Sequence, residues 1–469
     1  MLQPFELSAA EAARQVRSRA LSPVALVESL LSRIDGLEPR LQAWVRVDRE
    51  GALAEARRKE AELAQAPAEP SPRRTTTSRV SSRTPTSGLL YGVPVGLKDI
   101  FYTAGVPTTA CSKVYANFVP EYDGTAVAKL KQAGAIILGK TVTTEFACMD
   151  PSPTFNPWNA AHTPGGSSSG SAVAVAARMC PAALGSQTVG STLRPAAYNG
   201  IVGFKPTFGR VSRYGVVPVS WSLDTVGWLV RTVEDAALLC QVLAGPDPQD
   251  PAASVQPVSD YMAGMQRPKA PRIGLLRRFF YDQADAATQQ HLDSVAERLA
   301  LAGANVVELP MPDSIDTAFS DQRVIMDVEG AAFHQPMYQR QAQDYQPRLR
   351  EMIGRGLATD AVSYSRALER RRRFTSDAER LAGRVDVLLT PATPTPAQAD
   401  RTNTGNALFQ GPWTSAGLPA ISIPSGVAAS GLPLGIQLAA APFAEARLLA
   451  AARWCEIILD LHLRPPLGD

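Results

Sequence analysis

Hydrophobic positions along this chain alternate between helical spacing and short continuous runs. A helix predicted over 126–133 leads into an apolar run at 135–140, which predicts a buried strand. Farther along, strands predicted over 272–276 and 305–309 enclose a helix predicted over 286–302. This order of strand, helix and strand is typical of α/β proteins with a largely buried sheet.

Helical spacing also dominates two longer parts of the chain. The first 65 residues are predicted to be helical, and Ser22 is predicted to cap a helix that begins at Pro23. The apolar residues that follow recur at helical spacing: Leu26, Leu30, Leu31 and Ile34. The charged stretch 315–382 is predicted to be helical as well. Two short apolar runs predict further buried strands, at 385–389 and 420–424.

Residues 66–88 separate the N-terminal helical part from the rest of the chain. The segment is rich in Pro, Ser, Thr and Arg, a composition that does not pack into a core. We predict an exposed loop that is a surface insertion and not a binding element.

The composition describes a globular protein with a large core. The chain has 469 residues, of which 45% are hydrophobic and 19% charged, and its formal net charge is +3. So small a charge does not indicate a nucleic-acid or membrane partner. The sequence contains no apolar run of about 18 residues and no basic, apolar leader at its start. We therefore expect a cytoplasmic protein.

The cysteines and histidines form no metal-binding pattern. No CxxC pair is present, and no cluster of His, Cys and Asp has metal-ligand spacing, so no metal or other cofactor is expected. The cysteines are expected to be reduced and mostly buried. They are Cys111, Cys148, Cys180, Cys240 and Cys455.

The segment 163–195 is unusually dense in glycine and serine. It reads TPGGSSSGSAVAVAARMCPAALGSQTVGSTLRP, with three serines behind two glycines and a second Gly-Ser step at Gly190 and Ser191. Glycine lets backbone amides approach a substrate, and serine hydroxyls can act as nucleophile or proton relay. The alternative is a turn-rich loop beside a buried helix. A base elsewhere in the chain decides between the two interpretations.

A match to the phosphate-binding pattern GxxxxGK[ST] is rejected. The match is GAIILGKT at 134–141, whose central Ile136, Ile137 and Leu138 favour a buried strand. A phosphate-binding loop needs the strand before the motif and a helix after it. The segment is therefore predicted to be a strand.

The histidines supply no catalytic base, and the arginine run does not indicate a binding site. Of the four histidines only His162 is near the serines, and no GxSxG nucleophile elbow is present. The others are His291, His334 and His462. Four adjacent arginines at 370–373 point around a predicted helix, so a solvated face is favoured over an anion site.

Lysine is the remaining candidate base. Lys98 ends the strand predicted in GVPVGLKDIF, among apolar residues and glycines. A solvated lysine has a pKa near 10.4, but burial in an apolar site lowers the pKa. A buried Lys98 could then accept a proton from a serine. The alternative is a surface pair of Lys98 with Asp99 at the strand end.

A series of long motifs follows a fixed order between 90 and 239 and again near the C-terminus. They are GVPVGLKDIF, GAIILGKTVTTEFA, GGSSSGSAVAVAA, GSQTVGSTLRPAAYNGIVGFKPTFGRVS, SLDTVG, GLPAISIPSG and GLPLGIQL. By these motifs the chain resembles the amidase signature family. The resemblance implies an α/β fold with a large central mixed β-sheet flanked by helices on both faces. It also implies one domain over 1–469, with its core at 90–239.

The resemblance further implies a Ser-Ser-Lys triad. Lys98 matches the base, Ser167 matches a bridging serine on a cis peptide bond, and Ser191 matches the nucleophile. The backbone amides of the loop that ends at the nucleophile match the family's oxyanion-binding group. Ser168 is predicted to be a further substrate-binding or supporting residue. The loop consists of Thr188, Val189, Gly190 and Ser191.

The chain departs from the family pattern D-x-G-G-S-[IL]-R-x-P around the nucleophile. Gln187 stands where Asp is usual, Val189 where the first Gly is usual, and Arg194 one position later than expected. The Cβ of Val189 restricts any positive φ in the loop. Without the carboxylate, Arg194 must be solvated or paired elsewhere.

The activity implied by the resemblance is hydrolysis of a carboxamide C–N bond through a serine acyl-enzyme. Two alternatives remain open: an amidotransferase A-type subunit that releases ammonia for tRNA-dependent transamidation, and a non-catalytic scaffold. The expected ligand is a small-molecule amide, and the sequence leaves open a homodimer or a partner subunit.

Substrate specificity is expected to come from 315–382 and 400–415. The candidate pocket residues are Arg323, Tyr338, Gln410 and Trp413.

Overall fold

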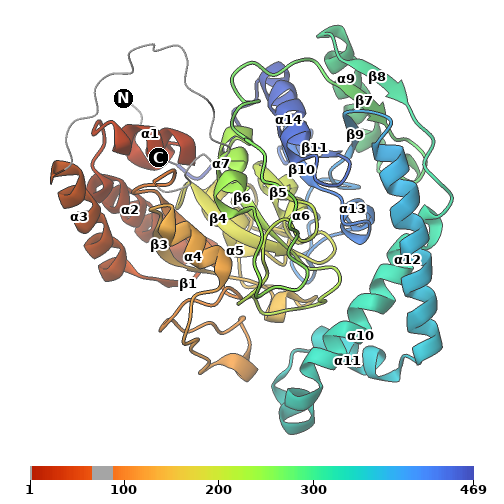
Figure 1. Ribbon diagram of the computed structural model, residues 1–469, viewed down its shortest axis with the longest axis horizontal. Coiled ribbons are helices and arrows are strands. Elements are labelled where there is room, and N and C mark those ends of the chain that lie inside the picture. The colour runs from red at the N-terminus through yellow and green to blue at the C-terminus, as the bar shows by residue number, and fades with distance from the viewer. Residues whose placement is uncertain (1–2, 66–87, 469) are drawn as a thin grey trace.

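A mixed sheet of eleven strands runs through the computed structural model, which describes residues 3–65 and 88–468 (Figure 1). Its order is β1-β3-β2-β4-β6-β5-β10-β11-β9-β7-β8. The strands are β1 (Trp44–Val47), β2 (Pro94–Lys98), β3 (Ile136–Thr141), β4 (Ala182–Gln187), β5 (Val202–Lys205), β6 (Thr225–Val230), β7 (Arg272–Leu275), β8 (Asn305–Glu308), β9 (Val387–Pro391), β10 (Ala420–Val427) and β11 (Pro433–Ala439). The loop predicted at 66–88 lies outside the described residues except for its last position.

Both strand directions occur in this sheet. β2 runs parallel to β3 and β4, β7 runs parallel to β8 and β9, and the other neighbouring pairs are antiparallel. The predicted α/β fold with a large mixed sheet is confirmed. The rejected phosphate-binding match forms β3, a strand buried between β1 and β2.

Helices cover both faces of the sheet. They are α1 (Ala9–Arg17), α2 (Pro23–Leu41), α3 (Arg49–Gln65), α4 (Thr125–Gln132), α5 (Ser169–Ala176), α6 (Leu193–Asn199), α7 (Val233–Leu243), α8 (Phe280–Gln283), α9 (Ala286–Leu301), α10 (Ile315–Gln341), α11 (Pro347–Ala358), α12 (Ala361–Ala382), α13 (Gly411–Ser415) and α14 (Glu445–Leu459). Short 3-10 turns occur at Pro4–Glu6, Lys113–Tyr115, Glu145–Ala147 and Ala342–Asp344.

Side-chain alternation along β6 shows how the two faces are filled. Trp228 and Val230 belong to the core cluster that contains α7 and α14, whereas Leu229 belongs to the cluster around α5. Successive residues of a strand point to opposite faces, so one strand contributes to both cores. Every residue of α5 is buried, as expected for a helix that is apolar or small on all sides.

The N-terminal part is helical apart from β1. Ser22 caps α2 by accepting hydrogen bonds from the backbone N–H groups of Val24 and Ala25, both at 3.1 Å, and Pro23 is the first helical residue. The predicted apolar positions of α2 are all buried. β1 was not predicted, because only Trp44 of its four residues is buried and so short a segment shows little alternation.

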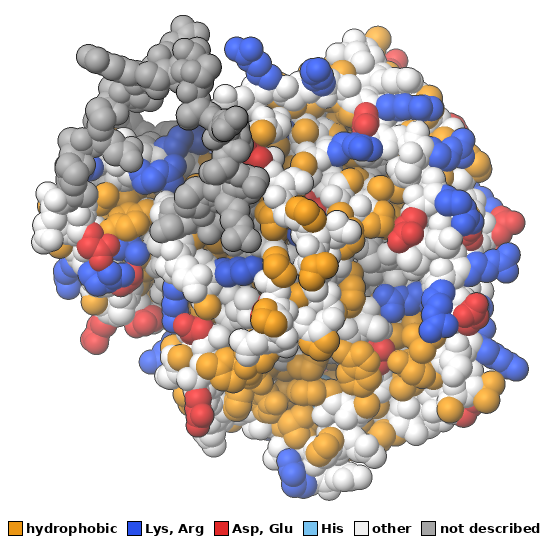
Figure 2. All heavy atoms as spheres, in the orientation of Figure 1, with side chains coloured by type: hydrophobic (Ala, Val, Ile, Leu, Met, Phe, Trp, Pro, Cys, Tyr) orange, Lys and Arg blue, Asp and Glu red, His pale blue; other side chains and the backbone are white. Residues whose placement is uncertain are grey.

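The C-terminal half places three long helices at one side of the sheet. α10 packs against α11, α12 and α13, and Figure 1 shows α10, α11 and α12 on the right of the molecule. The helical prediction for 315–382 is confirmed. On the face drawn in Figure 2, acidic and basic side chains are interspersed, and apolar side chains gather in a hollow in its lower part.

The arginine run on α12 only partly matches the predicted solvated face. Arg372 and Arg373 are exposed, and Arg370 binds the carboxylate of Asp321. Arg371 instead points inward and donates to the backbone carbonyls of Ser415 and Ser222, both at 2.8 Å. Four adjacent residues span the whole circumference of a helix, so one of them faces the protein.

The described cysteines are unpaired, and four of the five are buried, as predicted. Within residues 3–65 and 88–468, no helix is both long and apolar enough to cross a membrane.

Candidate active site

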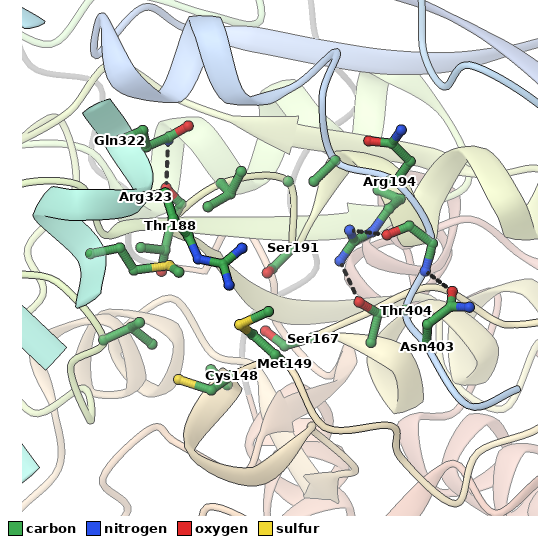
Figure 3. Close-up of a pocket in the computed structure, with 18 of the residues that line it drawn as sticks. Cys148, Met149, Ser167, Thr188, Ser191, Arg194, Gln322, Arg323, Asn403 and Thr404 are labelled. Atoms are coloured by element: carbon green, nitrogen blue, oxygen red, sulfur yellow. Dashed lines mark hydrogen bonds between the residues drawn. The ribbon is translucent and has the colours of Figure 1, made fainter. Parts of the chain in front are cut away.

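A cavity of about 290 Å³ lies beside the ends of β2 and β4. Its walls come from the loop after β4, the segment before α5, the helix α10 and the loop 403–407. Figure 3 shows the side chains of Ser167 and Ser191 pointing into it. The sequence therefore brings both predicted serines to one cavity, although 24 residues separate them in the chain.

Lys98 ends β2 in a fully buried position behind this cavity. Its Nζ lies 2.6 Å from Ser167 Oγ and 2.9 Å from Ser186 Oγ. Burial lowers the pKa of Lys98 to about 7. A substantial fraction of this amine is therefore neutral near neutral pH, as a base requires.

The alternative surface pair of Lys98 and Asp99 is wrong. Both residues are fully buried, and Asp99 accepts hydrogen bonds from the backbone N–H and side-chain hydroxyl of Thr109 at 3.0 and 2.6 Å. Its other carboxylate oxygen lies 3.7 Å from Nζ of Lys140. Asp99 is thus engaged away from Lys98, and burial dominates the pKa of the lysine.

The segment before α5 presents Ser167 to Lys98. The peptide bond between Gly166 and Ser167 is cis, as the family resemblance implies. The next residue, Ser168, is fully buried and does not line the cavity. Its hydroxyl donates to the carbonyl and accepts from the N–H of Ser186, both at 3.4 Å, and its backbone N–H donates to the carbonyl of Ser191 at 3.2 Å. Ser168 thus connects α5, β4 and the nucleophile loop.

The backbone carbonyls of the loop after β4 are held by neighbouring groups. Gln322 on α10 donates to the carbonyl of Thr188 at 3.0 Å, and Thr414 on α13 donates to the carbonyl of Val189 at 2.7 Å. The carbonyl of Gly190 accepts a backbone N–H of α6 at 3.0 Å. These three contacts set the orientation of successive peptide planes.

The same contacts determine where the loop amides point. In a trans peptide the C=O of one residue and the N–H of the next point in opposite directions. The N–H groups of Val189, Gly190 and Ser191 therefore face away from these partners, and no hydrogen bond among the described residues uses them. A Cβ on Gly190 would lie 2.8 Å from Gln410 Oε1 and 2.9 Å from Ala407 Cβ, so this position has no room for a side chain.

Two departures from the family pattern have a structural explanation. Val189 does not have a positive φ, so its Cβ causes no backbone strain. Gln187 accepts the backbone N–H groups of Thr192 and Leu193 through Oε1, both at 3.0 Å, and donates through Nε2 to Thr414 at 2.9 Å. The side-chain amide of Gln187 thus accepts the backbone N–H groups at the start of α6 and also donates to Thr414, the residue that holds the nucleophile loop.

Arg194, the third departure, pairs with backbone carbonyls instead of a carboxylate. Its guanidinium donates to the carbonyl of Gly405 at 2.8 Å, to Thr404 Oγ1 at 3.0 Å and to the carbonyl of Gly166. Burial lowers the pKa of Arg194 to about 10. This side chain therefore joins the peptide bond before Ser167 to the 403–407 loop.

The whole chain resembles known amidases. Residues 25–449 match the family model described as Amidase. The chain belongs to the amidase family. It is 36% identical to the glutamyl-tRNA(Gln) amidotransferase A subunit of Geobacter sp. strain M21, with 99% of each chain covered.

Solved structures extend this similarity. The peptide amidase of Stenotrophomonas maltophilia is 29% identical, with 99% of each chain covered and a TM-score of 0.84. A 6-aminohexanoate cyclic dimer hydrolase complexed with substrate is 26% identical over 99% of this chain and 100% of the other, with a TM-score of 0.85. The chain is accordingly an enzyme that acts on amide C–N bonds.

One of the four predicted pocket residues lines the amidase cavity. Arg323 lines it, but Tyr338, Gln410 and Trp413 do not. Tyr338 packs against Tyr345, Trp413 is buried among apolar residues, and Gln410 is buried against the nucleophile loop and donates to a backbone carbonyl. Large polar and aromatic residues in a variable segment can line a pocket or pack in the core. Their residue types alone do not distinguish a pocket position from a core position.

Two residues that contact the lysine or the nucleophile loop were not identified from the sequence. Ser186 contacts the lysine, and Asp224 accepts hydrogen bonds from Thr188 Oγ1 at 2.5 Å and from two backbone N–H groups. Burial raises the pKa of Asp224. Both residues lie within the motifs that carry the family resemblance. Their place in those motifs was the sequence signal that could have identified them.

No histidine among the described residues lines the amidase cavity, and His162 makes no contact with either serine among the described hydrogen bonds. In the described parts of the chain, no group of three or more His, Cys, Asp or Glu side chains is placed to hold a metal ion.

Replacing Gln187 with leucine should lower both stability and turnover. Leucine leaves two backbone N–H groups at the start of α6 without acceptors, which costs about 1–3 kcal/mol each when buried. Thr414, which donates to the carbonyl of Val189, also loses the hydrogen bond from Gln187 that orients its hydroxyl, and we expect kcat to fall about 10- to 100-fold. Thermal unfolding and amide turnover of Gln187→Leu check this. Gln187→Glu is the matched control because it keeps an acceptor for both N–H groups and loses only the donor to Thr414, and an equal loss of stability in both variants would contradict the role of the acceptor.

Proposed function

We propose that this protein hydrolyses a carboxamide through an acyl-enzyme on Ser191. The observation that carries the proposal is the 2.6 Å contact between Lys98 Nζ and Ser167 Oγ, formed by a buried lysine whose pKa lies near 7. A scaffold that only conserves the fold has no need of a buried amine at this position, because burying one costs free energy.

In the first step, neutral Lys98 accepts the proton of Ser167 while Ser167 accepts the proton of Ser191. The oxygen of Ser191 forms a bond to the amide carbonyl carbon, and the carbonyl oxygen takes up the negative charge. This charge needs donors that are already in place. The N–H groups of Val189, Gly190 and Ser191 supply them, because their carbonyl neighbours are held by the surrounding helices.

Collapse of this intermediate breaks the C–N bond. The proton held by Lys98 returns through Ser167 to the leaving nitrogen, which departs as ammonia or an amine. Water then attacks the ester carbon of the acyl-enzyme and gives up a proton through the same relay. The products are a carboxylic acid and free Ser191.

The proposal is tested by incubating the purified chain with simple carboxamides and measuring ammonia and acid release. Addition of hydroxylamine should divert the acyl group to a hydroxamate, because a nucleophile competes with water for an acyl-enzyme. Ammonia release without hydroxamate at saturating hydroxylamine would contradict the covalent intermediate.

A second candidate is an amidotransferase subunit that works with partner chains. The observation that favours it is the 36% identity to a glutamyl-tRNA(Gln) amidotransferase A subunit over 99% of both chains. Purification of the tagged chain at its native level distinguishes the candidates. A stoichiometric partner chain that raises ammonia release supports the amidotransferase, whereas full turnover by the chain alone supports the amidase. The continuous eleven-stranded sheet supports one domain in either case.

A further inference from the structure

The charged groups that line the amidase cavity are all cationic. Among the described residues that form its wall, three are arginines and none is aspartate or glutamate. The arginines are Arg194, Arg323 and Arg348. A cavity with cationic walls and no lining carboxylate favours a ligand with negative charge.

Arg194 is not available to such a ligand. Its guanidinium donates to two backbone carbonyls and one hydroxyl, and it is buried beneath the 403–407 loop. Arg348 at the start of α11 is half-buried, and its side chain donates one hydrogen bond among the described residues, to the carbonyl of Met149 at 3.5 Å.

Arg323 is the arginine whose bonding is least complete. It extends from α10, and Figure 3 shows its guanidinium pointing into the cavity toward Ser191. In the part of the chain that the structure describes, this guanidinium makes no hydrogen bond, and its buried Nε has only an ionic contact with Asp327. A guanidinium carries five N–H donors in a planar fork, and unbonded buried donors cost free energy.

The nearest carboxylate does not neutralise Arg323. Asp327 lies one turn along α10, with Oδ1 3.5 Å from Nε of Arg323. The same carboxylate already accepts two hydrogen bonds from Arg355, at 2.7 and 3.3 Å. One carboxylate between two arginines leaves one positive charge in excess, and the free face of that charge is the cavity.

We infer that Arg323, assisted by Arg348, binds a carboxylate on the substrate, so that the amide cleaved at Ser191 carries an acidic group. A carboxylate matches the guanidinium fork through two parallel hydrogen bonds. The inference rests on the proposed function, since it assumes that the reacting amide occupies this cavity. It names the substrate class: a small carboxamide with a carboxylate at the far end of its carbon chain.

The test compares amides that differ only in this charge. Malonamate, succinamate and glutaramate are each paired with the neutral amide in which an isopropyl group replaces the carboxylate. The wild-type protein should show a higher kcat/KM for at least one acidic amide than for its neutral partner. In Arg323→Gln this ratio should fall about 10- to 100-fold, and Arg323→Lys should retain part of it because the charge remains.

Arg340→Gln is the matched control, because Arg340 is an exposed arginine of the same helix outside the cavity. Its ratio should equal that of the wild type. An unchanged ratio in Arg323→Gln, or a wild-type preference for the neutral amides, overturns the inference while leaving amide hydrolysis intact.

Failure of the proposed function gives a different result, namely no ammonia from any amide. Binding then tests the inference, by calorimetric titration of succinate and glutarate. Binding by the wild type and by Arg340→Gln but not by Arg323→Gln supports the carboxylate site, and absence of binding to the wild type overturns it.

Discussion

Ser191→Ala should lower amide hydrolysis by about 10,000-fold or more, the largest effect expected of any single substitution in this chain. The variant keeps the lysine, the relay serine and the loop amides but has no oxygen to form the acyl-enzyme. What activity remains comes from substrate binding and oxyanion stabilisation alone. Initial rates of ammonia release under saturating substrate measure the loss.

Ser169→Ala is the matched control for this prediction. Ser169 begins α5, and its buried hydroxyl has no hydrogen-bond partner among the described residues. Alanine removes an unsatisfied group and favours the helix, so activity and stability should be retained. Turnover by Ser191→Ala at the wild-type rate, with Ser169→Ala equally active, would show that Ser191 is not the nucleophile.

Lys98→Met should lower kcat by about 100- to 10,000-fold, the range expected for loss of a general base. Methionine has a similar length and fits a fully buried site, so the cavity keeps its shape. Stability should change little, because removal of an unfavourably buried amine offsets the loss of its hydrogen bonds to Ser167 and Ser186.

The pH dependence separates this effect from a change of packing. Protonated Lys98 cannot accept a proton, and burial lowers its pKa to about 7. Wild-type kcat/KM should therefore rise as pH increases through about 7 and level off above it. The residual activity of Lys98→Met should lack that rise. A variant with the same rise and a uniformly lower rate would show that another group is the titrating base.

The elements that the sequence predicted well are those with a clear period. The strand and helix units around β3 and between β7 and β8 combine an amphipathic helix with an apolar run, and both were found within a few residues. β4 and β6 were not identified, although they lie at the centre of the sheet. Both are buried on two faces, so they lack alternation, and β4 in particular consists mainly of small residues.

The site was predictable to the extent that it follows motif order. Lys98 was a candidate base from its apolar surroundings, the roles of Ser167 and Ser191 came from the resemblance, and the structure places all three at one cavity. The supporting contacts were not predictable, because they join residues far apart in the chain. Gln322 reaches a loop 134 residues away, and Thr414 reaches the same loop across 225 residues.

The contacts of the residues that depart from the family pattern were not predictable either. The sequence shows that Gln187 and Arg194 cannot form the usual pair of opposite charges. It does not show that an amide oxygen can accept two backbone N–H groups, or that the arginine can bind carbonyls of the 403–407 loop. Those partners become visible only once α13 and the 403–407 loop are folded against this part of the chain.

Covalent trapping identifies the nucleophile and its base in one experiment. The purified protein is treated with a serine-directed fluorophosphonate, and the labelled residue is located by peptide mass spectrometry. We expect one label on Ser191, faster labelling as pH rises through about 7, and much slower labelling in Lys98→Met. A label on another residue, or equal labelling of Lys98→Met at every pH, would contradict these roles of Ser191 and Lys98.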